Sequence, residues 1–283
     1  MKVGDALREG KVRLRDADLD LSELEAESLL QHILGLDRAG LFRDLGQPIG
    51  DVLLASYRKL LDRRCAHEPT AYIIGHREFF GIDLRVTPAA LIPRPETEAL
   101  VQSAIDFVRS TLPHREVSIV DVGTGSGAIA ISLAANLPNA IVTATDLSSE
   151  ALDLARGNAE ANGVADRVRF VQGDLLELIH EPVDVIAANL PYVTSSEWQG
   201  LPLELKDNEP KLALEGGADG LDLVRRLLAQ APARLAPGGA LFEEVGDGHA
   251  STVLSLAAAA FPDARIEMAP DLAGTPRVLC VYS

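Results

Sequence analysis

The sequence predicts an α/β protein in which a parallel central sheet with an antiparallel edge hairpin follows a small N-terminal helical bundle. Three observations predict this fold class. The first 70 residues carry apolar side chains at helical spacing, and from about residue 95 strand and helix patterns alternate. Such alternation is typical of a parallel sheet covered by helices on both faces. The tail adds two apolar segments, 264–268 and 277–282, that suit an antiparallel hairpin.

Residues 1–70 are predicted to form the helical domain. Ser22 to Glu25 has the pattern of a capping box at the start of a helix. The apolar face of this helix consists of Leu24, Leu29, Leu30, Ile33 and Leu34. A second helix is predicted from Asp51 to Arg64. Its inward side chains are expected to be Val52, Leu53, Leu60 and Leu61.

Residues 71–94 are predicted to be a linker, with a β-hairpin over 78–92 that alternates through Ile82, Leu84 and Val86. Residues 95–283 then form the second domain. Its strands are predicted at 117–122, 140–145, 168–172, 183–188 and 239–245, with helices between them such as 150–162. A ligand of such a sheet is expected at the carboxyl ends of the strands.

The composition excludes several classes of protein. Hydrophobic residues make up 47% and charged residues 24%, as in ordinary soluble proteins. No run of 18 apolar residues indicates a membrane span, and the N-terminus lacks the apolar core of a secretory signal. Cys65 and Cys280 make no disulfide framework, and the six histidines are scattered. We expect a cytoplasmic protein that binds neither a metal nor a membrane.

The net charge of −16 lies mostly in the second domain. Residues 1–70 hold 11 basic and 13 acidic side chains, so the other 213 residues hold 15 and 29, a net charge of −14. An acidic body repels nucleic-acid phosphates and attracts a basic protein surface. The charge also fits a role in solubility alone, and the sequence favours neither explanation.

Three predicted strands end in residues suited to a nucleotide-like ligand. After 117–122 comes a loop of alternating glycines up to Gly127, which lets a ligand approach the backbone next to a helix N-terminus. Asp146 ends the second strand, where a carboxylate can accept both hydroxyls of a ribose. Asp174 follows the third strand and can accept from an adenine amino group.

Each of these features has a simpler explanation. Gly123, Gly125 and Ala128 also fit the dinucleotide fingerprint G-x-G-x-x-G/A, so the loop alone allows an NAD enzyme. The loop also suits a tight turn without ligand. Asp146 suits a helix N-cap, although Ser148 can fill that position, and Asp174 suits an ordinary turn.

The fourth strand, 183–188, ends in Asn189-Leu190-Pro191-Tyr192 and separates these alternatives. The lone pair of a planar amide or aromatic amine is a poor nucleophile, and acceptors aimed at both of its N–H bonds favour charge development on the nitrogen. Asn189 offers a side-chain oxygen. Leu190 offers a backbone carbonyl held extended by Pro191, and Tyr192 offers a flat face. A nicotinamide enzyme needs none of these groups, so the tetrapeptide favours a methyltransferase acting on a planar nitrogen.

With these motifs together, the chain resembles the release factor glutamine methyltransferases, the PrmC/HemK family. Ile92 to Glu98 is similar to the family motif IPRP-x-TE, and Asn208 to Asp222 is similar to its EP-x-x-AL-x-GG-x-DG loop. The resemblance implies a class I (Rossmann-like) methyltransferase domain and the donor S-adenosylmethionine. It implies as acceptor the glutamine of the Gly-Gly-Gln motif in class I peptide release factors. Residues 1–70 would then help to recognise the protein substrate.

The resemblance also specifies the site. The predicted catalytic and substrate-binding residues are Asn189, Leu190, Pro191 and Tyr192. The predicted cofactor-binding residues are Arg94, Asp121, Gly123, Thr124, Gly125, Ser126, Gly127, Asp146, Asp174, Leu175 and Asn189.

One residue departs from the family pattern, which usually reads Asn-Pro-Pro-Tyr. Leu190 stands in place of the first proline, and Asn-Leu-Pro-Tyr is also the form of ribosomal RNA adenine dimethyltransferases. An adenine-N6 methyltransferase acting on RNA or DNA is therefore the alternative function. The acidic charge, the upstream motif and the helical domain favour the protein substrate. A binding protein without catalysis is a third hypothesis, disfavoured because a binder needs neither Asn189 nor Tyr192.

Three further features carry weaker predictions. Trp198 and the segment 194–207 fit a loop over the site, and core packing fits almost as well. Glu209 and Pro210 either shape this loop or start a helix. Glu243 and Glu244, at the end of the fifth strand, are predicted to lie on the exposed surface.

Overall fold

The computed structural model describes residues 1–283, which form two compact units. The first unit comprises residues 1–76 together with 203–208, and the second comprises residues 77–202 and 209–283. None of the helices combines the length and the apolar character that crossing a membrane requires. No three side chains of the metal-ligating types gather into a group that could hold a metal ion.

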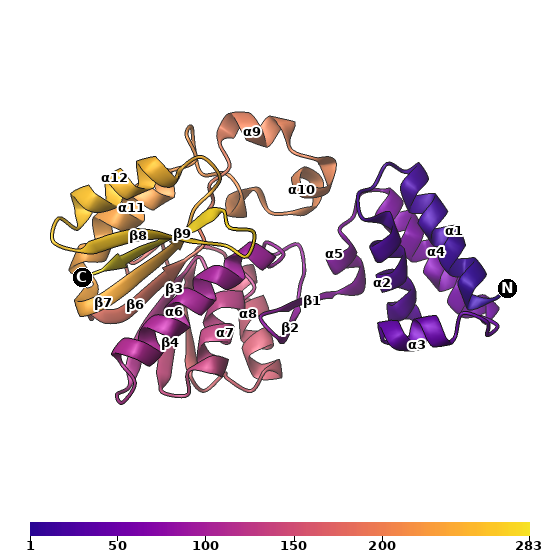
Figure 1. The fold of residues 1–283 in the computed structure, drawn as a ribbon, viewed down its shortest axis with the longest axis horizontal. Coiled ribbons are helices and arrows are strands. Elements are labelled where there is room, and N and C mark those ends of the chain that lie inside the picture. The colour runs from indigo at the N-terminus through magenta and orange to yellow at the C-terminus, as the bar shows by residue number, and fades with distance from the viewer. The chain divides into compact units, whose positions relative to one another are not determined.

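The first unit is a bundle of helices around one apolar core (Figure 1). Its helices are α1 (Val3–Asp16), α2 (Ser22–Leu34), α3 (Arg38–Arg43), α4 (Asp51–Cys65) and α5 (Thr70–Ile74). Tyr57 of α4 is fully buried in this core and donates a hydrogen bond of 3.1 Å to the carbonyl of Ala26. The helix predicted from Asp51 to Arg64 is confirmed as α4, which ends one residue later.

The predicted capping box at Ser22 is wrong. Ser22 is the first residue of α2, after Leu21 in the left-handed region with a φ of 53°, and no side chain caps the helix. Glu25 instead accepts hydrogen bonds from Arg64 Nε at 2.9 Å and from Thr70 Oγ1 at 3.0 Å. A buried guanidinium is costly without a carboxylate partner, so the ion pair outweighs a local cap.

The predicted inward faces are partly wrong. Leu29, Leu30 and Leu61 are buried as expected, whereas Leu24, Val52 and Leu53 are exposed. The three exposed side chains all lie in the first turn of their helices. Helical spacing specifies which side chains share a face, but it does not specify how far along that face a neighbouring helix extends.

A short helix from the second half of the sequence belongs to the first unit. This helix, α10 (Leu203–Asn208), contributes Glu204, whose Oε2 accepts a hydrogen bond of 2.6 Å from Arg64 Nη2. Asn208 Nδ2 donates a hydrogen bond of 3.1 Å to the carbonyl of His67. The segment 194–207 is thus not one loop, because α9 (Ser195–Gly200) belongs to the second unit.

The hairpin predicted over 78–92 is confirmed but shorter. Strands β1 (His76–Phe79) and β2 (Ile82–Arg85) pair in a two-stranded sheet, with Leu84 fully buried. Residues 86–94 have no strand and run as a coil.

The second unit is built on a seven-stranded sheet in the order β5-β4-β3-β6-β7-β9-β8 (Figure 1). Neighbouring strands from β5 to β7 are parallel, and β9 pairs antiparallel with β7 and β8. The strands are β3 (Val117–Val122), β4 (Ala140–Asp146), β5 (Val168–Gln172), β6 (Val183–Ala188), β7 (Leu235–Glu244), β8 (Arg265–Pro270) and β9 (Pro276–Tyr282). The predicted fold class, with its antiparallel edge hairpin, is confirmed.

Helices cover both faces of this sheet (Figure 1). One face carries α6 (Glu98–Thr111), α7 (Ala128–Asn136) and α8 (Ser149–Ala161), and the other carries α11 (Asp222–Gln230) and α12 (Ala250–Ala260). Short 3₁₀ turns lie at Pro95–Thr97, Lys211–Ala213 and Ala231–Ala233. All six residues of β6 are buried, because helices cover the strand on both sides. After β3 the chain forms β4 and β5 on one side of β3, and it then crosses to form β6 on the other side. The carboxyl ends of β3 and β6 therefore mark the topological switch point.

The prediction that Glu243 and Glu244 are exposed is wrong. At the end of β7 their exposed fractions are 0% and 1%. Alternation along the strand sends Glu243 toward the α11 and α12 face and Glu244 toward the start of α6. Both carboxyl groups therefore lie inside the protein, on opposite sides of the sheet.

Candidate active site

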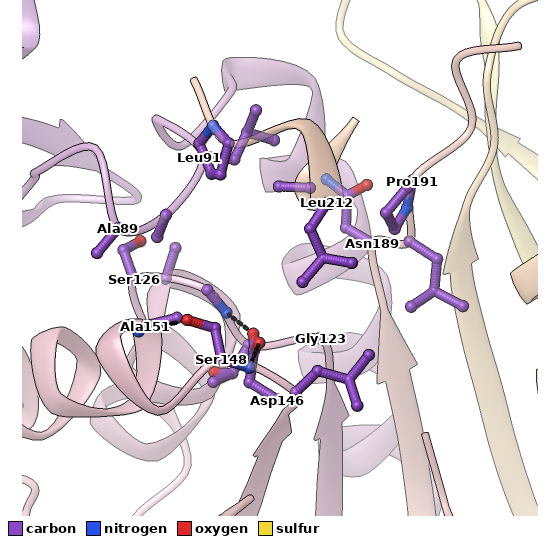
Figure 2. A pocket seen from close by; sticks show the side chains of 18 of the residues that line it. Ala89, Leu91, Gly123, Ser126, Asp146, Ser148, Ala151, Asn189, Pro191 and Leu212 are labelled. Atoms are coloured by element: carbon purple, nitrogen blue, oxygen red, sulfur yellow. Dashed lines mark hydrogen bonds between the residues drawn. The ribbon is translucent and has the colours of Figure 1, made fainter. Parts of the chain in front are cut away.

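A cavity of about 240 Å³ lies at the carboxyl ends of β3, β4, β5 and β6, where the sequence predicts a ligand site (Figure 2). It collects most of the predicted site residues, namely Arg94, Gly123, Thr124, Gly125, Ser126, Asp146, Asp174, Leu175, Asn189, Leu190 and Pro191. Three predicted residues, Asp121, Gly127 and Tyr192, do not line it.

Gly123 and Gly127, in the loop after β3, combine a positive φ with close neighbours. Gly123 has a φ of 73°, and a Cβ there would come within 3.3 Å of the Leu190 side chain. Gly127 has a φ of 86°, and its Cβ would lie 2.8 Å from Ile131 Cδ1. Glycine at position 127 therefore lets α7 pack closely against the loop, and glycine at position 123 leaves room for the Leu190 side chain.

Asp121, near the end of β3, stabilises this loop through hydrogen bonds. Its Oδ2 accepts hydrogen bonds from Thr124 Oγ1 at 2.6 Å and from the N–H of Ala130 at 3.1 Å. The carboxyl is fully buried, and burial raises the pKa of Asp121 to about 7. Asp121 is completely enclosed, and its two hydrogen bonds fix the loop and the start of α7.

Asp146 ends β4 inside the cavity (Figure 2). Its Oδ2 accepts from the N–H of Gly125 and its Oδ1 accepts from the N–H of Ser148, both at 2.9 Å. The helix N-cap is Ser148, whose hydroxyl accepts from the N–H of Ala151. Since a carboxylate oxygen has two lone pairs, each oxygen of Asp146 keeps one for a ligand.

Asp174 lines the cavity after β5. Its Oδ2 accepts a hydrogen bond of 2.7 Å from Arg226 Nη2, whereas its buried Oδ1 has no partner. An orphaned buried oxygen is costly, so a ligand N–H at this point would be favourable. The next residue, Leu175, has a φ of 51° and lines the same wall.

Asn189, Leu190 and Pro191 form the wall at the end of β6 (Figure 2). Leu190 is buried, and its side chain packs in the core on the α11 and α12 side. Asn189 Nδ2 donates a hydrogen bond of 3.0 Å to Thr97 Oγ1. The amide of Asn189 is thus anchored at its nitrogen end.

Tyr192 lies behind this wall. A Cβ on Gly246 would lie 2.7 Å from the Tyr192 ring, and the phenol oxygen is 3.5 Å from Glu244 Oε1. Burial, followed by the nearby Glu244 carboxylate, raises the pKa of Tyr192 to about 12. The phenol is therefore neutral over the physiological range.

The loop of residues 214–220 braces the segment from Pro191 to Val193. The N–H of Val193 donates to the carbonyl of Leu214 at 2.9 Å, and the N–H of Gly216 donates to the carbonyl of Val193 at 2.8 Å. A Cβ on Gly216 would collide with the carbonyl of Pro191. Glycine at this position lets the two backbones touch, which explains the Gly-Gly pair in this loop.

Arg94 lines another side of the cavity and pairs with Glu209. Arg94 Nη2 donates a hydrogen bond of 2.5 Å to Glu209 Oε1, and the N–H of Ile92 lies 3.4 Å from Glu209 Oε2. Glu209 is 5% exposed. Its contacts tie residues 92–94 to the segment that follows it, in which Pro210 is the N-cap of the 3₁₀ turn Lys211–Ala213.

Several cavity residues were missed by the sequence analysis. Pro88 to Leu91 line the cavity, although the alternating pattern placed them in the hairpin. Ser148 and Leu212 also line it, on opposite walls (Figure 2). Thr97 lay within the IPRP-x-TE motif and was the available signal for the partner of Asn189.

Comparisons with known proteins match segments of both units. Residues 5–75 match the model of the PrmC N-terminal domain, and residues 98–201 match that of the methyltransferase small domain. Among solved structures, a methyltransferase from Pyrococcus furiosus has a TM-score of 0.51 at 23% identity, covering 72% of this chain and 89% of that one. The hMettl16 catalytic domain has a TM-score of 0.56 at 19% identity, covering 79% and 81%. At these identities the two structures establish the fold alone.

Relatives cover the entire chain. A release factor glutamine methyltransferase of Bradyrhizobium diazoefficiens is 42% identical over 98% of this chain and 93% of its own length. One of Moorella thermoacetica is 40% identical over 100% of this chain and 99% of its own length. Such identity over both units, together with the class I methyltransferase fold, shows that the chain belongs to the release factor glutamine methyltransferases.

Proposed function

We propose that this protein transfers a methyl group from S-adenosylmethionine to the side-chain amide nitrogen, N5, of the glutamine in the Gly-Gly-Gln motif of class I peptide chain release factors. The observation that carries the proposal is the cavity itself. Asn189 and Leu190, which carry the proposed acceptor groups, line the same space as Asp146 and Asp174. A donor and a planar amide can therefore meet in it.

The residues present fit the donor. The spare lone pairs of Asp146 suit the two hydroxyls of a ribose, and the orphaned Oδ1 of Asp174 suits the amino group of an adenine. The open glycine loop suits the amino-acid end of the donor, with Arg94 as a charged partner. S-adenosylmethionine supplies a methyl group already activated on a sulfonium.

The tetrapeptide after β6 is proposed to hold the target amide. Asn189 Oδ1 and the carbonyl of Leu190 accept its two N–H bonds, which orients the nitrogen and stabilises the positive charge that develops there. The proton can leave after the carbon–nitrogen bond forms, so positioning supplies much of the rate. A flat contact with Tyr192 requires the target amide to reach past Pro191, because Tyr192 does not line the cavity.

The helical unit is proposed to recognise the body of the release factor, and the acidic second unit is proposed to favour a basic protein surface over nucleic acid. Because release factors act in translation, this function places the enzyme in the cytoplasm.

The test is mass spectrometry of a purified class I release factor after incubation with the enzyme and S-adenosylmethionine. We expect one added methyl group on the Gly-Gly-Gln glutamine, and nearly none with Asn189→Ala at saturating donor and release factor. The lost acceptor costs about 1–3 kcal/mol and misalignment can add a factor of about a hundred. Methylation of adenine in ribosomal RNA, with an unmodified release factor, would contradict the proposal.

A further inference from the structure

A chain of side-chain contacts links the catalytic segment to a carboxylate that the proposed reaction does not use. Asn189 Nδ2 donates to Thr97 Oγ1 at 3.0 Å, and Thr97 Oγ1 donates to Glu244 Oε2 at 2.5 Å. Tyr192 reaches the other oxygen of the same carboxylate, with 3.5 Å between the phenol oxygen and Glu244 Oε1. Thr97 and Glu244 are both buried, at 4% and 1% exposure. Asn189 is thus linked to the Glu244 carboxylate through Thr97, and Tyr192 is linked to it directly.

The direction of these hydrogen bonds follows from the number of protons. A threonine hydroxyl has one hydrogen, and an ionised carboxylate can only accept. With Glu244 ionised, the Thr97 hydrogen goes to Glu244, and Thr97 Oγ1 can only accept from Asn189. The nitrogen end of the Asn189 amide must then face Thr97. Its oxygen accepts no hydrogen bond from the chain and, because Asn189 lines the cavity, is available to a ligand there.

A proton on Glu244 removes this constraint. Protonated Glu244 can donate to Thr97 Oγ1, whose own hydrogen is then free to be donated to Asn189 Oδ1. In that arrangement the Asn189 amide is turned over and presents N–H groups to the cavity. An N–H group cannot accept a hydrogen bond from a substrate amide. Asn189 would then repel the substrate N–H group that it is proposed to bind.

We propose that Thr97 and Glu244 are positioning residues that hold the Asn189 side-chain oxygen toward the cavity as the acceptor for the substrate N–H. The proposal rests on the proposed function insofar as the substrate is an amide. The orientation of Asn189 itself does not depend on the substrate, because it follows from the hydrogen bonds to Thr97 and Glu244 and from the ionised state of Glu244.

The surroundings of Glu244 determine when it is ionised. Burial raises the pKa of Glu244 above 4.5, the nearby Glu96 carboxylate adds to this, and the hydrogen bond from Thr97, the Arg277 guanidinium and the Tyr192 hydroxyl oppose it. Glu243, the preceding residue, also lies close enough to interact. As the pH is lowered, the Asn189 amide should therefore turn over at a pH above the one at which an exposed glutamate takes up its proton.

The first test separates orientation from folding. In single-turnover assays at saturating donor and release factor, Thr97→Val should lower the rate by about ten- to a hundredfold, since an acceptor is lost from the substrate. Thr97→Ser keeps the hydroxyl and should retain most of the rate. Both variants should bind S-adenosylhomocysteine like the wild type. Ser103→Ala removes a hydroxyl that bonds only to Ala99 within α6 and is the matched control. Equal rates for Thr97→Val and Thr97→Ser would overturn the proposal.

The second test uses pH. The single-turnover rate of the wild type should fall as the pH is lowered through the pKa of Glu244. In Glu244→Gln the side chain cannot titrate, so the rate should be independent of pH over the same range, whatever its level. An identical acid limb in both enzymes would show that Glu244 does not control the step.

The third test does not depend on activity. In protein labelled with ¹⁵N-asparagine, the side-chain NH₂ signal of Asn189 is identified by its loss in Asn189→Ala. It should shift in Thr97→Val, and its pH titration in the wild type should vanish in Glu244→Gln. A signal indifferent to both substitutions would overturn the proposal. If the signal responds but the release factor stays unmethylated, the orientation of Asn189 stands and the proposed function fails.

Discussion

Asp146 is the residue whose local geometry most directly supports donor binding. Both of its oxygens accept backbone N–H groups, which fixes the carboxylate at the place where we propose that the ribose binds. We expect Asp146→Ala to weaken binding of S-adenosylhomocysteine by about ten- to a hundredfold, because a charge-assisted hydrogen bond contributes about 1.5–3 kcal/mol. Isothermal calorimetry measures this. Asp153→Ala, which removes an exposed carboxylate of α8, should leave the affinity unchanged. Unchanged affinity in folded Asp146→Ala would exclude Asp146 from the site.

Glu243 is predicted to cost stability at neutral pH. Neither of its buried oxygens has a hydrogen-bond partner, although the N–H of Leu190 faces the carboxyl group. Burial raises the pKa of Glu243 well above 4.5. Well below pH 4.5 the group is neutral whether the chain is folded or unfolded, so ionisation costs nothing. Above that pH, ionisation of the glutamate lowers the free energy of the unfolded chain but not that of the folded chain. The free energy of unfolding therefore falls, by at most about 1.4 kcal/mol per pH unit, until the pH passes the pKa of the folded state.

The substitution that tests this is Glu243→Gln, which is neutral at every pH. Its free energy of unfolding relative to the wild type should therefore increase between about pH 5 and about pH 7.5. Urea denaturation at the two pH values measures the difference. Glu160→Gln, at an exposed position of α8, is the control and should show no such trend. A constant difference across the pH range for Glu243→Gln would contradict a raised pKa.

Among the elements, α1 and α8 each contain a glycine, with opposite expected effects. A Cβ on Gly10 of α1 would overlap the hydroxyl of Tyr57, whereas a Cβ on Gly157 of α8 meets nothing within 4 Å. Alanine is favoured over glycine inside a helix by about 1 kcal/mol. We expect Gly157→Ala to stabilise the protein by about that amount. Gly10→Ala should destabilise it by about 1–3 kcal/mol, because overpacking outweighs helix propensity.

Urea denaturation followed by circular dichroism compares the two glycine variants with the wild type. If Gly10→Ala were as stabilising as Gly157→Ala, the Tyr57 hydroxyl would not occupy the position next to α1. The hydrogen bond from Tyr57 to the carbonyl of Ala26 would then have to be absent as well.

For the whole molecule, charge is expected to govern the encounter with the substrate. The net charge of −14 on residues 71–283 should speed association with a basic release-factor surface at low salt. Raising the ionic strength from about 0.05 to about 0.5 M should lower kcat/KM several-fold while kcat stays nearly constant, because screening acts on approach. Steady-state assays over a salt series measure both constants. A salt-independent kcat/KM would assign the charge to solubility instead.

Local sequence was enough to predict the central strands and the residues at their ends. The bounds of β3, β5 and β6 agree with prediction, because each is a short segment of mainly apolar residues bounded by turn residues, a pattern that needs only neighbours in the chain. The glycine loop and the tetrapeptide after β6 were predictable for the same reason. In a parallel sheet the carboxyl ends of all strands lie along one edge, so the positions of Asp146 and Asn189 after their strands were sufficient to place both at the edge that holds the cavity.

Which polar residues stay inside depends instead on the tertiary structure. Two consecutive glutamates at a strand end suggest a surface, yet Glu244 is buried against Thr97, 147 positions earlier in the chain. Likewise Glu204 of α10 pairs with Arg64, 140 positions away, which gives α10 to the first unit. Burial of a charged side chain depends on partners brought together by the fold, whereas periodicity records only the balance of apolar and polar residues along the chain.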